Sequence, residues 1–436
     1  MITAGSSVRS NSAALPNRKA AVSWALYDWA NSAFAVTVIS AFFPMFLKQY
    51  WSAGDDPTVS TFQLGVANSV ASIVVALLSP VLGAIADCGS AKKRYLVVFT
   101  ALAIIMTGAL PLVARGDWLL AIALFVLASI GFSASNIFYD ALIVEVARDE
   151  RLHSVSALGF SLGYLGGGLL FAANVAMTLW PQTFGLTDAT QAVRVSFALV
   201  AVWWTVFTVP LLLFVKETPA QHPATGWTAV RAGLRELAET FRQLRALRAV
   251  WIFLLAYWCY IDGVHTIARM AVDYGMALGF EANSLIVALL ITQFVGFPAA
   301  LAFGYAGERL GAKPAIFAGI AAYLGATLWS YFMTEVWEFY VLAVAIGLAQ
   351  GGVQSLSRSL YARIIPADRA GEFFGFYNML GKFAAVLGPV LVGVAGALSG
   401  SPRLAILAIL VLFIAGALLL SLVQERDSVR SFQVPS

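Results

Sequence analysis

Charged residues are scarce in this chain. Only 11% of its 436 residues are Asp, Glu, Lys or Arg, whereas 60% are hydrophobic. Ordinary soluble domains carry about 25% charged residues, so this composition cannot form a soluble surface. It predicts an all-α membrane protein that crosses the bilayer many times. The formal net charge of +4 gives no reason to expect a nucleic-acid partner.

Cysteine, histidine and enzyme motifs are also scarce or missing. The two cysteines, Cys88 and Cys259, lie in separate segments, so they indicate neither a disulfide framework nor a metal site. Only three histidines are present, and the sequence has no HExxH motif and no P-loop lysine. We therefore expect neither an enzyme nor an ATP-driven pump, and no cofactor.

Apolar runs of about 20 residues predict twelve membrane spans. They form six spans, a polar linker and six more spans. The predicted divisions are an N-terminal tail at 1–21, a six-helix bundle at 22–215, a linker with an amphipathic helix at 216–248, a second six-helix bundle at 249–423 and a C-terminal tail at 424–436. The spans are expected at 22–48, 62–86, 95–114, 118–143, 157–180, 194–215, 249–275, 283–306, 314–333, 337–361, 373–398 and 402–423.

Lysine and arginine set the expected orientation. With both termini in the cytosol, 20 of the 27 basic residues fall inside and four fall outside. Because loops rich in Lys and Arg stay on the cytosolic side, we predict a multi-pass membrane protein with both termini in the cytosol. The tail at 1–21 has no apolar core, so it is not a cleavable signal peptide. We expect a monomer in the lipid bilayer.

Two loops at matching positions resemble each other. The sequence GAIADCGSAKKR at 83–94 and the sequence GYAGERLGAK at 304–313 each contain a glycine, an acid four residues later, a glycine turn and basic residues. The cations can pair with the acid or with carbonyl groups that end neighbouring helices. Either loop alone could be an ordinary charged turn, but recurrence in both halves predicts two parallel repeats, the major facilitator fold. We assign Asp87, Glu308 and Arg309 to gating.

Six stretches within the predicted spans carry further polar and glycine-rich motifs: YDWANSAF at 27–34, NIFYDA at 136–141, SALGFSLGYLGG at 156–167, YIDGVHTI at 260–267, QGGVQSLSRS at 350–359 and EFFGFY at 372–377. Together they resemble the vacuole effluxer family and its bacterial relatives. The resemblance covers nearly the whole membrane core. It implies a secondary transporter, in this chain one of the bacterial inner membrane. The fungal members are linked to amino-acid efflux from the vacuole, which makes an amino acid one hypothesis for the substrate, whereas the bacterial members are largely without an assigned substrate.

Polar and ionisable residues inside the spans are the candidate site. An ionisable side chain at membrane depth costs about 2.5–3.5 kcal/mol, so it is kept where it faces a bundle interior or a water-filled cavity. The candidate substrate-binding or coupling residues are Asp28, Asn31, Asn136, Tyr139, Asp262, His265, Arg269, Gln354 and Arg358.

Ion pairs are expected at the cytosolic side of the spans. Depth along the helices places Asp28, Asp140 and Arg358 there. We predict that these three residues form an inner gate that holds the two halves together. Lys382 is a further gating charge, expected to pair within its own half.

Near the middle of the membrane, Asp262 and His265 are a candidate proton-coupling pair. Together with Arg269 they recur at helical spacing and share one helix face. Carboxyl and imidazole groups in such places can exchange protons in the physiological range. The alternative is a structural ion pair of Asp262 with Arg269 or with a residue of the first span.

The sequence predicts a secondary active transporter that moves a small solute by alternating access, coupled to protons. An amino acid needs a cation for its carboxylate, Arg269 or Arg358, and an anion for its ammonium, Asp28 or Asp262. A proton-coupled exporter of drugs and a permease of peptides or sugars stay open as alternatives. A non-transporting membrane receptor or scaffold is the alternative of another class.

Overall fold

The computed structural model describes residues 18–52, 57–218, 227–242, 248–384 and 387–423. No strand occurs among them. The α-helices are α1 (Arg18–Ala33), α2 (Phe43–Phe46), α3 (Pro57–Gly89), α4 (Lys92–Ala109), α5 (Trp118–Ala141), α6 (Ile143–Val146), α7 (Leu152–Leu179), α8 (Ala189–Phe214), α9 (Trp227–Arg242), α10 (Arg248–Ala277), α11 (Ala282–Leu310), α12 (Ala312–Phe332), α13 (Val336–Ile364), α14 (Ala370–Phe383), α15 (Leu387–Ser399), α16 (Pro402–Leu407) and α17 (Ile409–Ser421). The π-helical segments are η1 (Phe34–Phe42) and η2 (Leu47–Trp51), and the 3₁₀ segments are η3 (Leu110–Leu112), η4 (Asp149–Arg151), η5 (Pro181–Phe184) and η6 (Ala367–Arg369).

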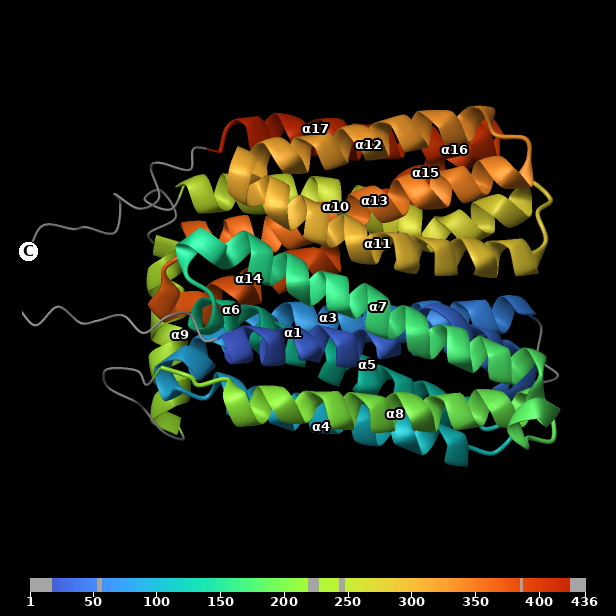
Figure 1. The fold of residues 1–436 in the computed structure, drawn as a ribbon, viewed down its shortest axis with the longest axis horizontal. Coiled ribbons are helices and arrows are strands. Elements are labelled where there is room, and N and C mark those ends of the chain that lie inside the picture. The colour runs from blue at the N-terminus through green and yellow to red at the C-terminus, as the bar shows by residue number, and fades with distance from the viewer. Residues whose placement is uncertain (1–17, 53–56, 219–226, 243–247, 385–386, 424–436) are drawn as a thin grey trace, which may run out of the picture.

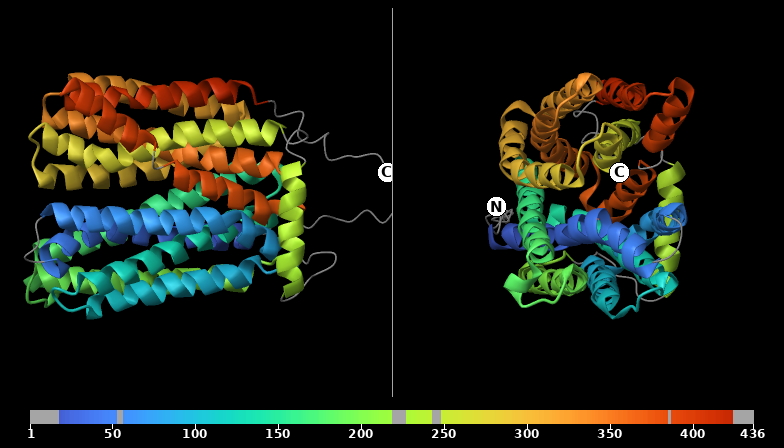
Figure 2. Two further views of the ribbon diagram at one scale, coloured as in Figure 1. Left: turned by 180° about the vertical axis from the view of Figure 1, so that it is seen from behind. Right: turned by 90° about the vertical axis from the view of Figure 1, so that its right-hand side faces the viewer.

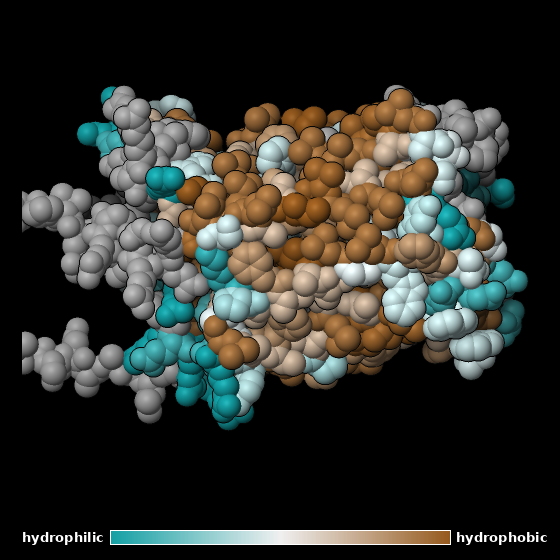
Figure 3. Space-filling view, turned by 90° about the horizontal axis from the view of Figure 1, so that it is seen from above, coloured by the Kyte–Doolittle hydropathy of each residue, from teal (hydrophilic) through white to brown (hydrophobic). Residues whose placement is uncertain are grey.

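Eleven helical stretches in the described part of the chain are long and apolar enough to cross a membrane. They coincide with eleven of the predicted spans, and the remaining one, 373–398, is occupied by the shorter helices α14 and α15. Large apolar side chains such as Leu77, Val202 and Val411 are exposed along these stretches. Figure 3 shows an apolar belt between two more polar ends. Such a surface is typical of contact with lipid, so the all-α membrane fold is confirmed.

The helices form two groups that lie side by side (Figures 1 and 2). The first group runs from α1 to α8, and the second runs from α10 to α17. Helix α9 lies across the end of the molecule at which α1 begins and α17 ends, hereafter the α9 end. The predicted tails lie largely outside the described residues, although α1 begins at Arg18, within the predicted N-terminal tail.

The start of a helix leaves backbone N–H groups without helical partners. Helices α8 and α13, which begin opposite the α9 end, satisfy some of them locally. The carboxylate of Asp188 accepts a 2.7 Å hydrogen bond from Gln191 N at the start of α8, and Glu335 and Glu338 form a capping box at the start of α13. Helices α7 and α14 begin at the α9 end, and the residues that precede them offer no side-chain cap.

Both of these helix starts instead receive an acid from the other group. Asp87, near the end of α3, accepts hydrogen bonds of 3.0 Å from Gly371 N and 2.8 Å from Glu372 N in the first turn of α14. Glu308, near the end of α11, accepts a 3.2 Å hydrogen bond from Ser154 N in the first turn of α7. Each group of helices therefore supplies the acid that caps one helix of the other group.

The loops that follow these acids each place a lysine against the end of a neighbouring helix. The ammonium of Lys93 donates to the carbonyl oxygens of Leu212 and Val215 at the end of α8. The ammonium of Lys313 donates in the same way to the carbonyl oxygens of the residues that end α17, Ser421 and Val423. The prediction that these cations pair with helix-ending carbonyl groups is confirmed.

Glycines allow α3 and α14 to cross closely near the α9 end. A Cβ atom at Gly83 would collide with the carbonyl group of Gly371. A Cβ atom at Gly375 would lie 2.5 Å from the carbonyl oxygen of Ser79. Only glycine fits at these two positions, because the backbones of the two helices are in contact there.

We predict that Gly83→Ala weakens this crossing. The added methyl group forces the helices apart, and overpacking of this kind costs about 1–3 kcal/mol. Gly65→Ala is the matched control, because Gly65 lies on the same helix with no atom within 4 Å of a Cβ placed there. Both variants gain the same helix propensity, about 0.5–1 kcal/mol.

The measurement is thermal unfolding of the purified proteins in detergent. Gly83→Ala should unfold at a lower temperature than Gly65→Ala, because only Gly83→Ala is overpacked. Equal unfolding temperatures for the two variants would contradict a tight crossing.

Candidate functional site

A polar cavity of about 340 Å³ lies between the two groups of helices. Helices α1, α5 and α7 form one wall, and α10, α13 and α14 form the other. The lining is rich in charged, amide and aromatic side chains, in contrast to the apolar outer surface. It consists of Asp28, Asn31, Ser32, Ala35, Phe132, Asn136, Tyr139, Asp140, Phe160, Tyr257, Ile261, His265, Gln354, Arg358, Tyr377, Asn378, Gly381 and Lys382.

Helical spacing explains why these side chains meet. Asp28 and Asn31 are three residues apart on α1, and Asn136 and Asp140 are four apart on α5. Residues at these spacings share one face of a helix, so each helix directs a polar stripe at the cavity. Lys382 reaches the cavity from α14, in the opposite wall. Most of the residues predicted from the sequence therefore lie around one space.

Arg358 on α13 is the centre of an ion-pair cluster. Its Nη1 atom lies 3.3 Å from Oδ2 of Asp28 and 3.2 Å from Oδ1 of Asp140. Both acids belong to the first group of helices, and Arg358 belongs to the second. The structure thus brings together the three residues that were assigned to the inner gate, and their ion pairs join the two groups.

The rest of the guanidinium is also occupied. Its Nε donates to Oγ of Ser156 and its Nη2 to the carbonyl oxygen of Ser156, both at 2.9 Å. Its central carbon lies 4.2 Å from the ring centroid of Phe160 and 4.8 Å from that of Trp24. Arg358 is only 2% exposed. A charge buried to this degree requires paired acids and hydrogen bonds, and this one has both.

Neutral side chains orient the two acids. The hydroxyl of Tyr139 donates a 2.8 Å hydrogen bond to Oδ2 of Asp28. Trp24 stacks on Tyr139 with 4.4 Å between ring centroids. The side-chain amide of Asn378 donates a 3.0 Å hydrogen bond to Oδ2 of Asp140 across the cavity. The carboxylates are therefore held in place before any ligand arrives.

The residues assigned to gating in the two loops take different positions. Asp87 is 8% exposed, pairs with Lys92 at 2.9 Å and caps α14 of the other group. Glu308 caps α7 of the other group. The guanidinium carbon of Arg309 lies 4.4 Å from the ring centroid of Tyr305 on its own helix, and its side chain is exposed. The two acids thus lie at contacts between the groups, and Arg309 lies on the surface of its own.

Asp262 and His265 lie in different environments. His265 lines the polar cavity. Asp262 is 0% exposed, and its Oδ1 accepts hydrogen bonds of 3.0 Å from Gly388 N and 3.2 Å from Oγ1 of Thr266. The sequence did not indicate this contact with the start of α15. The side chain of Arg269 lies outside the described part of the structure.

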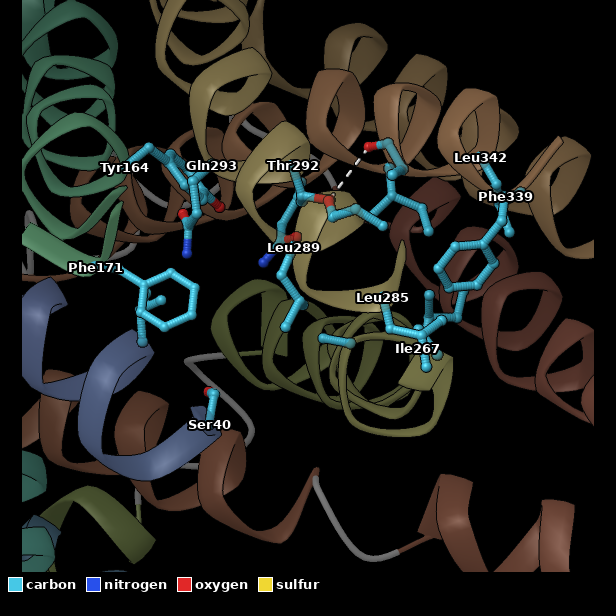
Figure 4. A pocket seen from close by; sticks show the side chains of 17 residues that line it. Ser40, Tyr164, Phe171, Ile267, Leu285, Leu289, Thr292, Gln293, Phe339 and Leu342 are labelled. Carbon is cyan, nitrogen blue, oxygen red and sulfur yellow. Dashed lines mark hydrogen bonds between the residues drawn. The ribbon is translucent and has the colours of Figure 1, made fainter. Parts of the chain in front are cut away.

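A second, more apolar cavity of about 190 Å³ is lined by residues of both groups of helices (Figure 4). Phe171, Leu289 and Phe339 are among its lining residues. Tyr164 lines this cavity and donates a 3.1 Å hydrogen bond to Oε1 of Gln354, which lines the polar cavity. The Tyr164–Gln354 hydrogen bond therefore links the linings of the two cavities.

Further hydrogen bonds between the groups run from the α9 end toward the middle. Nδ1 of His153 lies 2.8 Å from Oγ of Ser359, near the α9 end. Ser161, about 14 Å along α7 from its start, donates a 2.9 Å hydrogen bond to the carbonyl oxygen of Phe297. Together with the Arg358 cluster and the two capping acids, these contacts hold the groups together at the α9 end.

Sequence reasoning missed several residues of the site. Ser156 and Phe160, which hold Arg358, lie in one of the quoted motifs but were not assigned a role. Asn378 directly follows another quoted motif and is the amide that holds Asp140. Trp24 carried no signal, because an aromatic residue near a span end is usually an interfacial anchor.

Comparisons with known proteins identify the family and the fold. Residues 58–152 and 144–432 match the family described as "Vacuole effluxer Atg22 like". An uncharacterized MFS-type transporter of Bacillus subtilis, YxiO, is 37% identical over 414 residues, which are 93% of this chain and 95% of that protein. Autophagy-related protein 22 of Yarrowia lipolytica is 29% identical over 298 residues, 60% of this chain and 50% of the fungal protein.

Solved structures with the same fold are transporters. The human organic anion transporter MFSD10 has a TM-score of 0.73 and 15% sequence identity, over 93% of this chain and 100% of that chain. The proton:xylose symporter XylE has a TM-score of 0.68 and 13% identity, over 93% of this chain and 94% of that chain. Similarity at such identities shows the major facilitator fold alone. With the family match over most of its length, the chain belongs to the vacuole effluxer family and is a multi-pass membrane transporter, not an enzyme.

Proposed function

We propose that the protein is a secondary active transporter of amino acids that works by alternating access and is coupled to protons. The observation that carries the proposal is the Arg358 cluster, a set of opposite charges buried in a cavity between the two groups of helices. The α9 end lies in the cytosol in this proposal, as the distribution of basic residues predicts. Both termini then lie in the cytosol of a bacterial cell.

The contacts at the α9 end form the inner gate in this mechanism. Opening the cavity to the cytosol requires Arg358 to leave Asp28 and Asp140. It also requires Asp87 to leave the start of α14 and Glu308 to leave the start of α7. Water that enters the opened cavity replaces these partners. The described conformation is then one with its cytosolic side closed.

An amino acid suits a cavity that carries both signs of charge. Asp28 and Asp140 can attract its ammonium group, and the cations of the lining can attract its carboxylate. The chain matches a family described as vacuole effluxers, and this match is consistent with a small solute as substrate. The more apolar cavity beyond Tyr164 offers space for an apolar side chain.

We further propose that Asp262 carries the coupled proton and that His265 connects it to the cavity. The carboxylate of Asp262 lies at the start of α15, where negative charge is favourable. Protonation removes that charge and weakens the contact between α10 and α15. His265 lies one turn away on α10 and lines the cavity, so a proton has a short route to Asp262.

The first test is flux of the common α-amino acids into proteoliposomes with an imposed pH gradient. We expect gradient-driven flux of at least one amino acid by the wild type. Flux only of a drug, peptide or sugar would move the substrate to one of the alternatives named above. No flux of any of these would favour a receptor or scaffold.

We predict that Arg358→Gln opens the α9 end. Breaking a buried ion pair by removing one partner costs about 3–5 kcal/mol, and each 1.4 kcal/mol changes an equilibrium tenfold. A cysteine replacing Ser32 in the cavity, with Cys88 and Cys259 replaced by serine, should then react at least about a hundredfold faster with an impermeant maleimide added on the α9 side.

The control for this experiment is Arg235→Gln on α9, where the side chain of Arg235 is 83% exposed. It should leave the labelling rate unchanged. An unchanged rate in Arg358→Gln as well would show that the cluster does not close the cavity.

We predict that Asp262→Asn abolishes accumulation driven by the pH gradient and retains exchange of substrate across the membrane at equal pH. Asparagine still accepts the hydrogen bond from Gly388 N but cannot carry the proton. Asp188→Asn is the control, because Asp188 accepts a backbone N–H at the start of α8, on the exposed surface. Gradient-driven accumulation that survives in Asp262→Asn would make Asp262 a structural acceptor only.

A further inference from the structure

We propose that Lys382 on α14 binds the carboxylate of the transported amino acid. This inference rests on the proposed function, and it assigns a role that the sequence had given to Arg269 or Arg358. Its basis is the distribution of charge and contacts around the polar cavity.

Arg358 is poorly suited to bind a substrate carboxylate in the described conformation. Its Nη1 faces both acids, and its Nε and Nη2 donate to Ser156. Aromatic rings of Phe160 and Trp24 lie close to the guanidinium. A carboxylate could reach Arg358 only by displacing Asp28 or Asp140, which would open the gate before the substrate is enclosed.

The cluster leaves an excess of negative charge on its side of the cavity. One guanidinium faces two carboxylates, so Arg358, Asp28 and Asp140 together carry a net charge of about −1 when both acids are ionised. The side chains of Asp28 and Asp140 keep 12% and 11% of their surface exposed and line the cavity. An ammonium group is therefore attracted to this side, and a carboxylate is repelled from it.

Lys382 supplies the opposite charge at a suitable place. It lies in the last turn of α14, one helical turn beyond Asn378, the residue that holds Asp140. Its ammonium lies 5.8 Å from the ring centroid of Phe132 on α5, in the opposite wall. A lysine ammonium within about 6 Å of a ring centroid is attracted to the aromatic face, so Phe132 helps to position it at the cavity.

Lys382 and the two acids line the same cavity. An α-amino acid carries its ammonium and carboxylate on one carbon, so it can place the first at the acids and the second at Lys382. The amide side chains of Asn136 and Gln354 and the imidazole of His265 also line the cavity and can donate further hydrogen bonds. The lining thus fits a zwitterion.

The test compares an amino acid with its carboxamide, which keeps the ammonium group and lacks the negative charge. The probes are the α-amino acid with the highest wild-type flux and its carboxamide. In the wild type the acid should compete for transport much better than the amide. In Lys382→Gln the half-saturation concentration of the acid should rise about tenfold to a hundredfold, and that of the amide should stay within about twofold.

Two further variants separate binding from a structural role. Lys382→Arg keeps the positive charge and should restore most of the preference for the acid. Lys48→Gln removes a lysine from an exposed position on η2 and should change neither probe. If Lys382 only supported the fold, Lys382→Gln would lower the maximal flux of the acid and the amide equally.

The outcomes distinguish this inference from the proposed function. If the wild type transports no amino acid, the proposed function itself is wrong. If the wild type transports an amino acid and Lys382→Gln keeps the full preference for the acid over the amide, the proposed function stands and the role of Lys382 is overturned.

Discussion

The burial of a positive charge between two groups of helices is the constraint on which this structure depends. Arg358 is 2% exposed, and a guanidinium in that position is stable only with acids and hydrogen bonds around it. Two acids, a serine and three aromatic rings from the first group meet this need. Since the residue and its partners lie on different groups, the electrostatics of the cavity and the contact between the halves form one system.

The starts of two helices also depend on contacts between the two groups. Helices α7 and α14 lack local caps and receive Glu308 and Asp87 from the opposite group. In the proposed mechanism each acid stabilises the partner half only while the α9 end is closed, and Gly83 lets the backbones approach closely enough for this contact. A local cap would have stabilised these helices in every conformation. Capping from the other group instead ties the stability of a helix end to the state of the transporter.

Much of this could be predicted from the sequence, because membrane spans and charges within them are strong signals. The length of apolar runs gave the spans, and the rarity of ionisable residues at membrane depth singled out Asp28, Asp140 and Arg358. The partner of Asp262 could not be predicted in the same way. Gly388 contributes only a backbone N–H, which leaves no trace in residue type, and the division of the predicted eleventh span into α14 and α15 is not visible in its hydropathy.

An ion pair between two groups of helices suits a contact that breaks and re-forms better than a permanent contact. Breaking a buried pair by removing one partner leaves a charge unpaired in a dry interior, whereas opening a cavity brings water to all three charges at once. In the proposed opening of the α9 end, the free energy lost with the contacts of Arg358 is offset by hydration of Arg358, Asp28 and Asp140. Closed and open conformations can therefore lie close in free energy even though each single contact is strong, as alternating access requires. An apolar interface of the same area would lack this compensation, because water gains nothing from apolar surface.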